Sequence, residues 1–286
     1  MTVLLDAGVK ASILVEALPY IRRFWGRVVV VKYGGNAIGD SDSLASFAED
    51  VVLMRSVGMR PVVVHGGGPQ IGDLMERLGK TPVFREGLRV TDAETLDIAR
   101  MVLVGKVNRD IVGAINVHAA IAVGISGEDA GLLRATARSE ELGFVGDVAA
   151  VDASIIERLL AQELIPVVAT IGSDDTGQSY NINADTAAGA IAVALGAEKL
   201  VYLTNIEGIR RDVADPDSLV RRASVAEVRE MLGSGAVGEG MIPKVESCVS
   251  AVERGVGHAH ILDGREPHAL LLECFTDEGV GTMVER

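Results

Sequence analysis

The sequence predicts an α/β fold built on a parallel sheet with helices on both of its faces. Two observations support this prediction. Short runs of β-branched residues, such as VVVVKY at 28–33 and RPVVVH at 60–65, alternate with longer segments whose apolar residues recur at helical spacing. Continuous apolar runs of this length are typical of strands buried on both faces, and strands that alternate with helices form parallel βαβ units.

The individual elements are expected in the following order. Residues 6–24 have an amphipathic helical pattern that Pro19 should kink, and this helix either packs on its own domain or reaches another subunit. After the first two strands, the further strands expected are 121–125, 165–169, 199–204 and 258–263. The further helices expected are 43–58, 69–78, 92–118, 153–162, 184–195, 225–232 and 241–254. Three Gly-rich alternating segments are predicted to form hairpins at the rim of the sheet, at 81–90, 134–151 and 173–182.

The composition indicates a folded globular protein with an aliphatic core. The chain has 286 residues, of which 48% are hydrophobic but only 3% aromatic, and it contains 33 glycines. Its 27 basic and 40 acidic residues leave a net charge of −13, so the whole protein carries no electrostatic footprint for nucleic acid. The two cysteines cannot build a zinc motif or a disulfide framework, and no apolar run approaches the roughly 20 residues that span a membrane. We therefore expect a soluble cytoplasmic protein.

Glycine-rich loops follow the first two strands at their carboxyl ends, the edge where open parallel sheets bind ligands. The first strand ends in KYGGN at 32–36, and the second runs into HGGGPQIG at 65–72. Consecutive glycines between a strand and a helix let an anion approach backbone N–H groups closely. Neither loop matches the phosphate loop of P-loop enzymes or the dinucleotide-binding fingerprint. A phosphate cradle and a pair of tight turns are the two interpretations.

Four charged side chains are candidates for a functional site. Lys32 ends a strand that should otherwise be buried, and Lys244 begins a helix. Asp185 lies in the first turn of another helix, which Asn183 is expected to cap. Arg89 precedes a predicted capping box at 91–94, where its planar guanidinium could bind a carboxylate through two hydrogen bonds. Taken singly, a lysine in solvent and a carboxylate that stabilises a helix dipole are the simpler interpretations.

Several longer segments occur together in a recognisable order: VVVKYGGNA, VVVHGGGPQIG, GLRVTDAETLDIARMVLVGKVNRDIV, GFVGDV, YNINADTAAGAIAVALGAEKL and GMIPKVESC. They resemble the amino acid kinase family, and within it the arginine-sensitive members that act on N-acetyl-L-glutamate. The resemblance implies a three-layer sandwich around an open, mainly parallel eight-stranded sheet with two lobes. It implies a kinked helix for oligomerisation and regulation at 1–26, a lobe for acetylglutamate binding and dimerisation at 27–192, and a lobe for ATP and arginine at 193–286.

The reaction implied by the resemblance moves the γ-phosphoryl group of MgATP to the side-chain carboxylate of N-acetyl-L-glutamate, with Mg²⁺ carried by ATP and without direct protein ligands. A carboxylate is already ionised at neutral pH, so the site must align and neutralise two anions and needs no general base. Matched to the family's motifs, the implied residues are Lys32, Lys244 and Asp185 for catalysis, Gly67, Gly68, Arg89 and Asn181 for substrate binding, Gly34, Gly35 and Gly67 for phosphate binding, and Thr204, Asn205, Gly208 and Arg211 for nucleotide binding.

The N-terminal helix and the C-terminal stretch 268–282 resemble those of arginine-inhibited members. They imply feedback inhibition by L-arginine bound between Tyr20, His268, Glu273 and Gly279, and a homo-hexamer in which the N-terminal helices join three dimers. A PII-type regulator is a further partner that the sequence leaves open. The alternatives are a relative that phosphorylates an aminoadipate-type carboxylate and a nucleotide-binding regulator without catalysis, which should have lost one of the catalytic residues.

Overall fold

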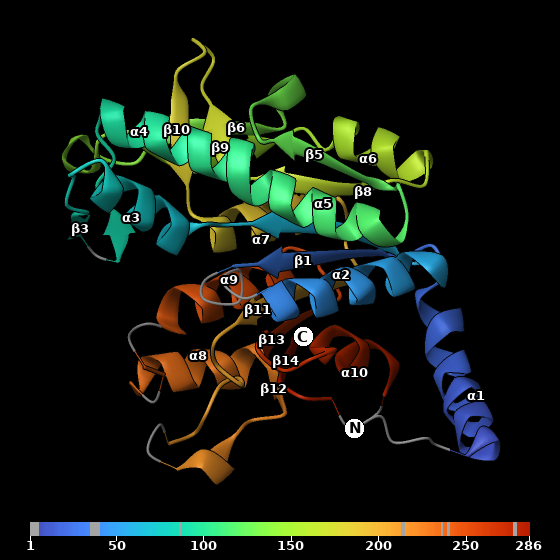
Figure 1. The fold of residues 1–286 in the computed structure, drawn as a ribbon. Coiled ribbons are helices and arrows are strands. Elements are labelled where there is room, and N and C mark those ends of the chain that lie inside the picture. Colours follow the sequence, from blue (N-terminus) through green and yellow to red (C-terminus); the bar gives the residue numbers. More distant parts are fainter. Residues whose placement is uncertain are drawn as a thin grey trace.

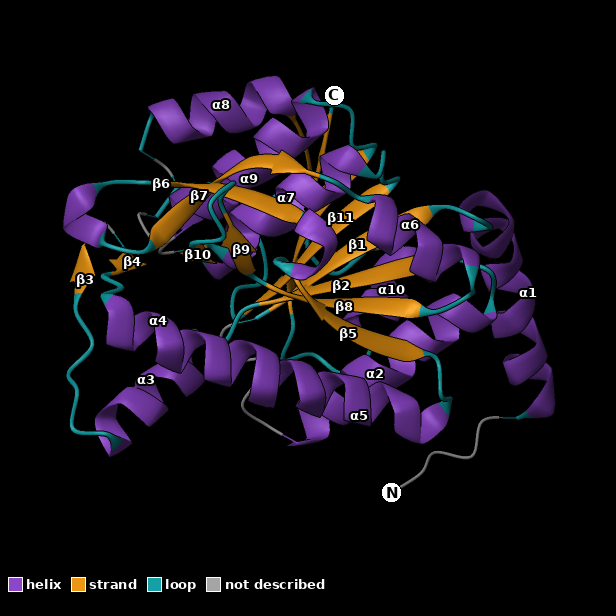
Figure 2. Ribbon diagram, turned by 90° about the horizontal axis from the view of Figure 1, so that it is seen from above, coloured by secondary structure: helices purple, strands orange, loops and turns teal. Residues whose placement is uncertain are grey.

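The predicted fold class is confirmed by a computed structural model, which describes residues 6–34, 41–85, 87–212, 215–235, 237–238, 241–276 and 279–286. Its centre is an eight-stranded sheet (Figure 1, Figure 2). In spatial order the strands are β12 (Arg222–Ser224), β14 (Thr282–Glu285), β13 (His258–Asp263), β11 (Lys199–Thr204), β1 (Val28–Tyr33), β2 (Arg60–His65), β8 (Ile165–Ala169) and β5 (Ala122–Ser126). Neighbouring strands are parallel except β13 and β14, which are antiparallel.

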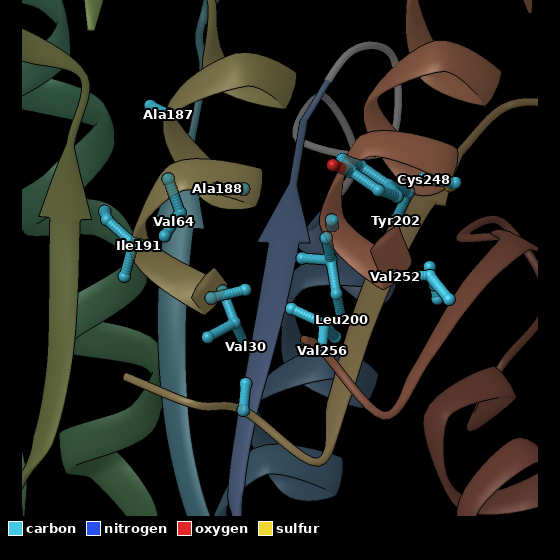
Figure 3. Close-up of a cluster of buried hydrophobic side chains, with 14 of the residues drawn as sticks. Val30, Val64, Ala187, Ala188, Ile191, Leu200, Tyr202, Cys248, Val252 and Val256 are labelled. Atoms are coloured by element: carbon cyan, nitrogen blue, oxygen red, sulfur yellow. The ribbon is translucent and has the colours of Figure 1, made fainter. Parts of the chain in front are cut away.

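Helices cover both faces of this sheet (Figure 2). One face carries α2 (Ser41–Ser56), α5 (Asn108–His118) and α10 (Ala269–Phe275), and the other carries α6 (Ser154–Ala161), α7 (Ala184–Ala194), α8 (Val225–Gly233) and α9 (Ile242–Glu253). Successive side chains of β1 alternate between the two layers, so that Val29 and Val31 pack on the first and Val30 on the second. Figure 3 shows the second layer, where Ile191 of α7 and Val252 of α9 face the strands.

The three predicted hairpins are present, but two of them combine. The strands β6 (Leu133–Ala137), β7 (Val145–Val151), β9 (Ile171–Ser173) and β10 (Ser179–Ile182) close into a small barrel above one end of the sheet (Figure 1). The third hairpin pairs β3 (Phe84–Arg85) with β4 (Leu88–Arg89). Closure depends on the parallel pairings of β7 with β10 and of β6 with β9, which join the two hairpins. The local alternation therefore predicted each hairpin but not the barrel.

The helix expected at 92–118 is not a single α-helix. It consists of α4 (Ala93–Arg100), a π-helical segment at Met101–Val107 and then α5. The expected capping box at 91–94 is also wrong, because Asp92 caps α4 by accepting a hydrogen bond from the Thr95 N–H at 2.8 Å. The Thr91 hydroxyl instead donates to the carbonyl oxygen of Arg89. Thr91 therefore secures the end of β4 rather than the start of the helix.

The N-terminal helix α1 (Ala7–Phe24) begins at its cap Asp6, contains Pro19 and lies at one side of the molecule (Figure 1). Over its described length only Phe24 is buried, and large apolar side chains are exposed, namely Val9, Ile13, Leu14, Val15 and Leu18. The remaining helices are α3 (Gly68–Arg77) and short 3₁₀ turns at Asp129–Gly131, Glu140–Leu142 and Pro216–Ser218. Within the described ranges, no helix combines the length and apolar character that crossing a bilayer requires.

The boundary expected between residues 192 and 193 falls in the last turn of α7. The sheet does not divide there, because β1 and β11 pair in parallel register from Val29 opposite Lys199 to Tyr33 opposite Leu203. Strands from the two sides of the boundary thus form one continuous sheet. The carboxyl ends of β1, β2 and β11 lie at the same edge, and this arrangement positions the candidate site.

Candidate active site

A cavity of about 280 Å³ lies at the carboxyl edge of the sheet. It is lined by Lys32 of β1, by segments that follow β2, β8 and β10, and by β4 and the first turn of α9. Every residue for which we expected a catalytic or substrate-binding role lines this cavity: Lys32, Gly67, Gly68, Arg89, Asn181, Asp185 and Lys244. The fold therefore gathers into one site residues that are widely separated in the sequence.

Asp185 links the two lysines of the cavity. Its Oδ1 forms an ion pair with Lys32 Nζ at 2.9 Å, and its Oδ2 accepts a hydrogen bond from Lys244 Nζ at 2.9 Å. The side chains of Lys32 and Asp185 are both only 8% exposed. Burial alone would raise the pKa of Asp185, but the two ammonium groups outweigh it and hold the pKa below its usual value. The carboxylate is therefore ionised at neutral pH and fixes two positive charges side by side.

The backbone around Asp185 is held from two directions. The Asn183 side chain caps α7 as expected, because its Oδ1 accepts hydrogen bonds from the N–H groups of Asp185 and Thr186. The Asp185 carbonyl oxygen accepts hydrogen bonds of 3.2 Å from the hydroxyl groups of Tyr202 and Ser247. These contacts tie the start of α7 to β11 and α9, so the carboxylate is set before any ligand binds.

Glycines allow close approach at two places in the cavity. A Cβ atom on Gly34 would lie 2.7 Å from Lys32 Nζ, so a side chain at this position would displace the lysine. A Cβ atom on Gly67 would lie 2.7 Å from a methyl carbon of Leu103, which belongs to the π-helical segment. Gly67 precedes α3, whose first N–H groups have no partners within the helix. Gly35, for which we expected phosphate binding, lies outside the described residues.

Arg89 lines the same cavity as the lysines and lies at the end of β4. Its Nη2 donates a 2.8 Å hydrogen bond to the carbonyl oxygen of Gly68, and its guanidinium lies 4.8 Å from the ring centre of Phe84. Burial lowers the pKa of Arg89, yet a guanidinium stays protonated in proteins. Asn181 donates to the Thr91 hydroxyl at 3.4 Å, which places its amide next to β4. A guanidinium group and an amide thus both line this cavity.

The expected nucleotide-binding residues do not line this cavity. Thr204 ends β11, one position past the residue that pairs with the end of β1, and its hydroxyl donates to Asn205 Oδ1 at 3.3 Å. Gly208 packs so closely against Thr282 that a Cβ atom would clash, and the exposed Arg211 bonds through its backbone N–H to the carbonyl oxygen of Ser218. These residues end or follow β11, the strand next to the one that carries Lys32.

A second cavity, of about 210 Å³, lies between α1 and the C-terminal segments. Three of the four residues expected to bind arginine line it, namely Tyr20, Glu273 and Gly279. Glu273 Oε1 is 2.7 Å from His260 Nδ1, and Oε2 accepts the backbone N–H of Val280 at 3.0 Å. Burial would raise the pKa of Glu273, but the bond to His260 contributes most to lowering it below its usual value. A buried carboxylate therefore faces this cavity.

The expected position of His268 is wrong. Its Nδ1 is 2.6 Å from Asp50 Oδ1 on α2, and it lines a different cavity, of about 210 Å³, between α2 and the start of α10. The reason is its backbone, since His268 precedes α10 with φ at +58° and this left-handed turn directs the ring toward α2. The histidine near Glu273 is instead His260, which the alternation of β13 places on the same sheet face as residue 258.

Comparison with known proteins gives a consistent result. The sequence model described as the amino acid kinase family matches residues 27–263. Acetylglutamate kinase of Symbiobacterium thermophilum is 54% identical over 284 residues, which cover 96% of this chain and 97% of the relative. Acetylglutamate kinase of a Synechocystis strain is 52% identical over 280 residues, which cover 98% of this chain and 94% of the relative.

Solved structures agree in fold. N-acetylglutamate synthase from Neisseria gonorrhoeae, complexed with coenzyme A and N-acetyl-glutamate, is 29% identical with a TM-score of 0.85 over 96% of this chain. This chain spans 63% of that synthase chain. The same synthase complexed with coenzyme A and L-arginine gives a TM-score of 0.82, at 96% of this chain and 65% of the other. With the family match across most of its length and relatives above half identity, this chain belongs to the amino acid kinase family.

Proposed function

We propose that this chain is an ATP-dependent kinase that phosphorylates the side-chain carboxylate of N-acetyl-L-glutamate in arginine biosynthesis. The observation that carries the proposal is a single cavity containing two lysines bridged by a carboxylate, a glycine loop and a buried arginine. The names of the relatives at 52–54% identity support the same substrate. The products are ADP and an acyl phosphate, N-acetyl-L-glutamyl 5-phosphate.

The reaction is an in-line displacement between two anions. A carboxylate oxygen of acetylglutamate attacks the γ-phosphorus of MgATP, and the bond to the β,γ-bridging oxygen breaks, so that ADP leaves with the electron pair. No proton has to move. The main task of the protein is to neutralise the oxygens of the transferring group, and Lys32 and Lys244 supply the two positive charges, which Asp185 holds in place.

Substrate binding follows from the chemistry of the cavity walls. We assign the α-carboxylate of acetylglutamate to Arg89 and Asn181, because a guanidinium fork and an amide both line the cavity. We assign the phosphoryl oxygens to Gly67 and Gly68 after β2 and to Gly34 after β1, where N–H groups and space are available. The resemblance assigns the same role to Gly35, which lies outside the described residues. The side-chain carboxylate of the substrate then points toward the lysines.

The nucleotide is assigned to the neighbouring part of the sheet edge, at Thr204, Asn205, Gly208 and Arg211. Support comes from the register of β11 beside β1, which brings this segment next to Lys32. We divide the chain into the helix at 1–26, an acetylglutamate lobe at 27–192 and a nucleotide lobe at 193–286, because Lys32 and Lys244 come from different sides of the last boundary. Phosphoryl transfer occurs where the two lobes meet.

The cavity beside α1 is proposed as a site for feedback inhibition by L-arginine. The buried carboxylate of Glu273 is a natural partner for a guanidinium, and Tyr20 and Gly279 line the same cavity. A related synthase has been solved in complex with L-arginine, which supports arginine as a ligand of this fold. Inhibition requires arginine to bind a non-productive arrangement of the lobes more tightly than the productive one.

Assembly through α1 and a cytoplasmic location complete the proposal. The apolar side chains that α1 exposes support its packing on another subunit in a homo-hexamer of three dimers. Cys248 and Cys274 are both unpaired and buried, which agrees with a reducing compartment. Sedimentation of the full chain and of a variant without residues 1–26 tests the assembly. We expect a hexamer for the former and dimers for the latter.

The decisive experiment measures ATP-dependent hydroxamate formation with N-acetyl-L-glutamate, L-glutamate and L-2-aminoadipate as acceptors. We expect turnover with acetylglutamate to be at least about 100-fold above that with the other two acceptors, because the acceptor's acetyl amide and side-chain length must both match the site. A preference for aminoadipate would favour the related kinase, and absence of turnover with every acceptor would favour a nucleotide-binding regulator. Adding L-arginine to the same assay tests inhibition, and inhibition that survives deletion of residues 1–26 undiminished would exclude a part for α1.

A further inference from the structure

A buried histidine joins β2 to the glycine loop. His65 has no exposed surface, its Nδ1 is 3.0 Å from the Gly66 carbonyl oxygen, and its Nε2 is 3.1 Å from the side-chain nitrogen of Asn108. Burial lowers the pKa of His65 to about 4, so the ring is neutral at pH 7 and has one donor and one acceptor nitrogen. Since a carbonyl oxygen only accepts, Nδ1 carries the proton and Nε2 accepts from Asn108.

The Asn108 amide can adopt only one orientation. Its Nδ2 also donates to the carbonyl oxygen of Val167 at 2.9 Å, while its Oδ1 accepts a hydrogen bond from the Arg109 guanidinium. Rotating the amide by 180° would turn its oxygen toward the Val167 carbonyl oxygen and its NH₂ group toward Arg109. The arginine therefore orients the amide, and the amide in turn selects the proton position on His65.

The same helix supports the next loop residue. Asn108 is the first residue of α5 and directly follows the π-helical segment Met101–Val107. Within that segment, Leu103 and Val107 pack against Gly67 so closely that a Cβ atom there would lie 2.7 and 3.2 Å from them. π-Helical segments are rare and often occur at functional sites. One helix thus contacts two consecutive parts of the loop, through His65 and at Gly67.

We propose that Asn108 is a positioning residue for phosphoryl transfer, which acts through His65 on the backbone of the loop from Gly66 to Gly68. Resting on the proposed function, the inference adds a hydrogen-bonded chain that runs from Arg109 through Asn108 and His65 to the loop. None of Arg109, Asn108 and His65 lines the cavity, so none touches substrate. Their effect is to set the direction of the N–H groups that the glycines present there.

The test compares Asn108→Asp with wild type. A carboxylate at this position cannot donate to Nε2 and instead stabilises a second proton on the ring, so the pKa of His65 should rise well above 4. We expect kcat in the variant to fall by about 10–100-fold as the pH rises through this new pKa, because deprotonation breaks one of the two ring contacts and moves the loop. Wild type should show no such step.

A second readout does not depend on activity. Among the ring ¹⁵N resonances of the five histidines, wild type should show one with the proton on Nδ1 that disappears in His65→Gln. That resonance should become doubly protonated near neutral pH in Asn108→Asp. If wild type fails to phosphorylate acetylglutamate, the proposed function is wrong while these shifts still test the chain of hydrogen bonds. If Asn108→Asp keeps wild-type kcat and a flat pH profile, the positioning role is overturned.

Two further variants separate positioning from folding. Asn116 on the same helix uses its amide to hold Ala122 N–H and C=O at the start of β5, so Asn116→Asp is a matched control that should leave the pH profile of kcat flat. At Gly124 a Cβ atom would clash with the side chains of Asn108 and Arg109. Gly124→Ala should therefore displace these two side chains and lower kcat by at least about fivefold, without changing any residue of the cavity. Wild-type kcat in folded Gly124→Ala would also contradict the proposal.

Discussion

Asp185 Oδ2 accepts a 2.9 Å hydrogen bond from Lys244 Nζ, which joins the first turn of α7 to the first turn of α9. Replacing this lysine by methionine, Lys244→Met, keeps most of the side-chain volume but removes one of the two charges to which we assign neutralisation of the transferring phosphoryl group. We expect kcat to fall by about 10²–10³-fold with little change in the melting temperature. The hydroxamate assay measures the loss. Lys106→Met, which removes an exposed lysine paired with Asp110, is the control and should keep wild-type kcat.

The planar guanidinium group of Arg89 can donate two parallel hydrogen bonds to a carboxylate, which the ammonium group of a lysine cannot. In Arg89→Lys a single ammonium cannot bond the Gly68 carbonyl oxygen and also bind a carboxylate through two parallel hydrogen bonds. We expect KM for acetylglutamate to rise at least about tenfold while KM for ATP stays within about twofold. Arg85→Lys, on the adjacent strand of the same hairpin, should leave both constants unchanged, because Arg85 pairs with the exposed Glu141. An equal rise in both KM values would argue against selective contact with acetylglutamate.

Glu273 supplies the buried carboxylate of the cavity beside α1. Glu273→Gln keeps its shape but removes the charge that would pair with a guanidinium. We expect the arginine concentration for half inhibition to rise by at least about tenfold, with kcat in the absence of arginine unchanged. Glu253→Gln removes an exposed carboxylate that pairs with Arg229 on α8, and it serves as the control. Unaltered inhibition in Glu273→Gln would exclude this cavity as the arginine site.

Asp50 should lower the stability of the folded protein as the pH rises, whereas an ion-paired carboxylate raises it. Burial raises the pKa of this carboxyl from 3.8 to about 6, although His268 opposes the shift. Between about pH 4 and pH 6 the folded protein holds a proton that the unfolded chain releases, so the free energy of unfolding falls as the pH rises. The difference between wild type and Asp50→Asn should therefore fall across this window, by no more than about 1.4 kcal/mol per pH unit, and level off above it.

Urea unfolding at a series of pH values measures this difference. Asp73→Asn, which changes an exposed carboxylate on α3, is the control and should give a difference that is constant with pH. A constant difference for Asp50→Asn as well would show that the carboxyl is ionised in the folded protein throughout the window.

Local patterns were sufficient to predict most of the sheet and to single out charged residues that line the first cavity. The run VVVVKY forms β1 over the predicted residues because β-branched side chains suit a strand buried on both faces. Lys32 and Asp185 could be singled out because a charged group at the end of a buried strand or in the first turn of a helix is conspicuous in the sequence itself. That the two form an ion pair depended on the fold.

Features that depend on tertiary partners could not be predicted. Nothing in the residues at 92–118 distinguishes a π-helical turn from an α-helical one, and the packing of its Leu103 against Gly67 is a contact between segments far apart in the sequence. Likewise, the sequence shows His65 only as the last residue of an apolar strand, and its contact with Asn108 depends on the fold. The short strands β12 and β14, at one end of the sheet, carry too few residues to show a period, and they were not predicted at all.

The uninterrupted ladder between β1 and β11 restricts how the molecule can move. Its hydrogen bonds cross from one half of the sheet to the other, and the Lys32 strand and the Thr204 strand are neighbours in it. The two halves therefore cannot swing as separate bodies on a flexible linker. Any closure around substrates has to be an elastic change in the twist between these two adjacent strands. Because each strand carries a part of the site at its end, such a change would move the two parts relative to each other.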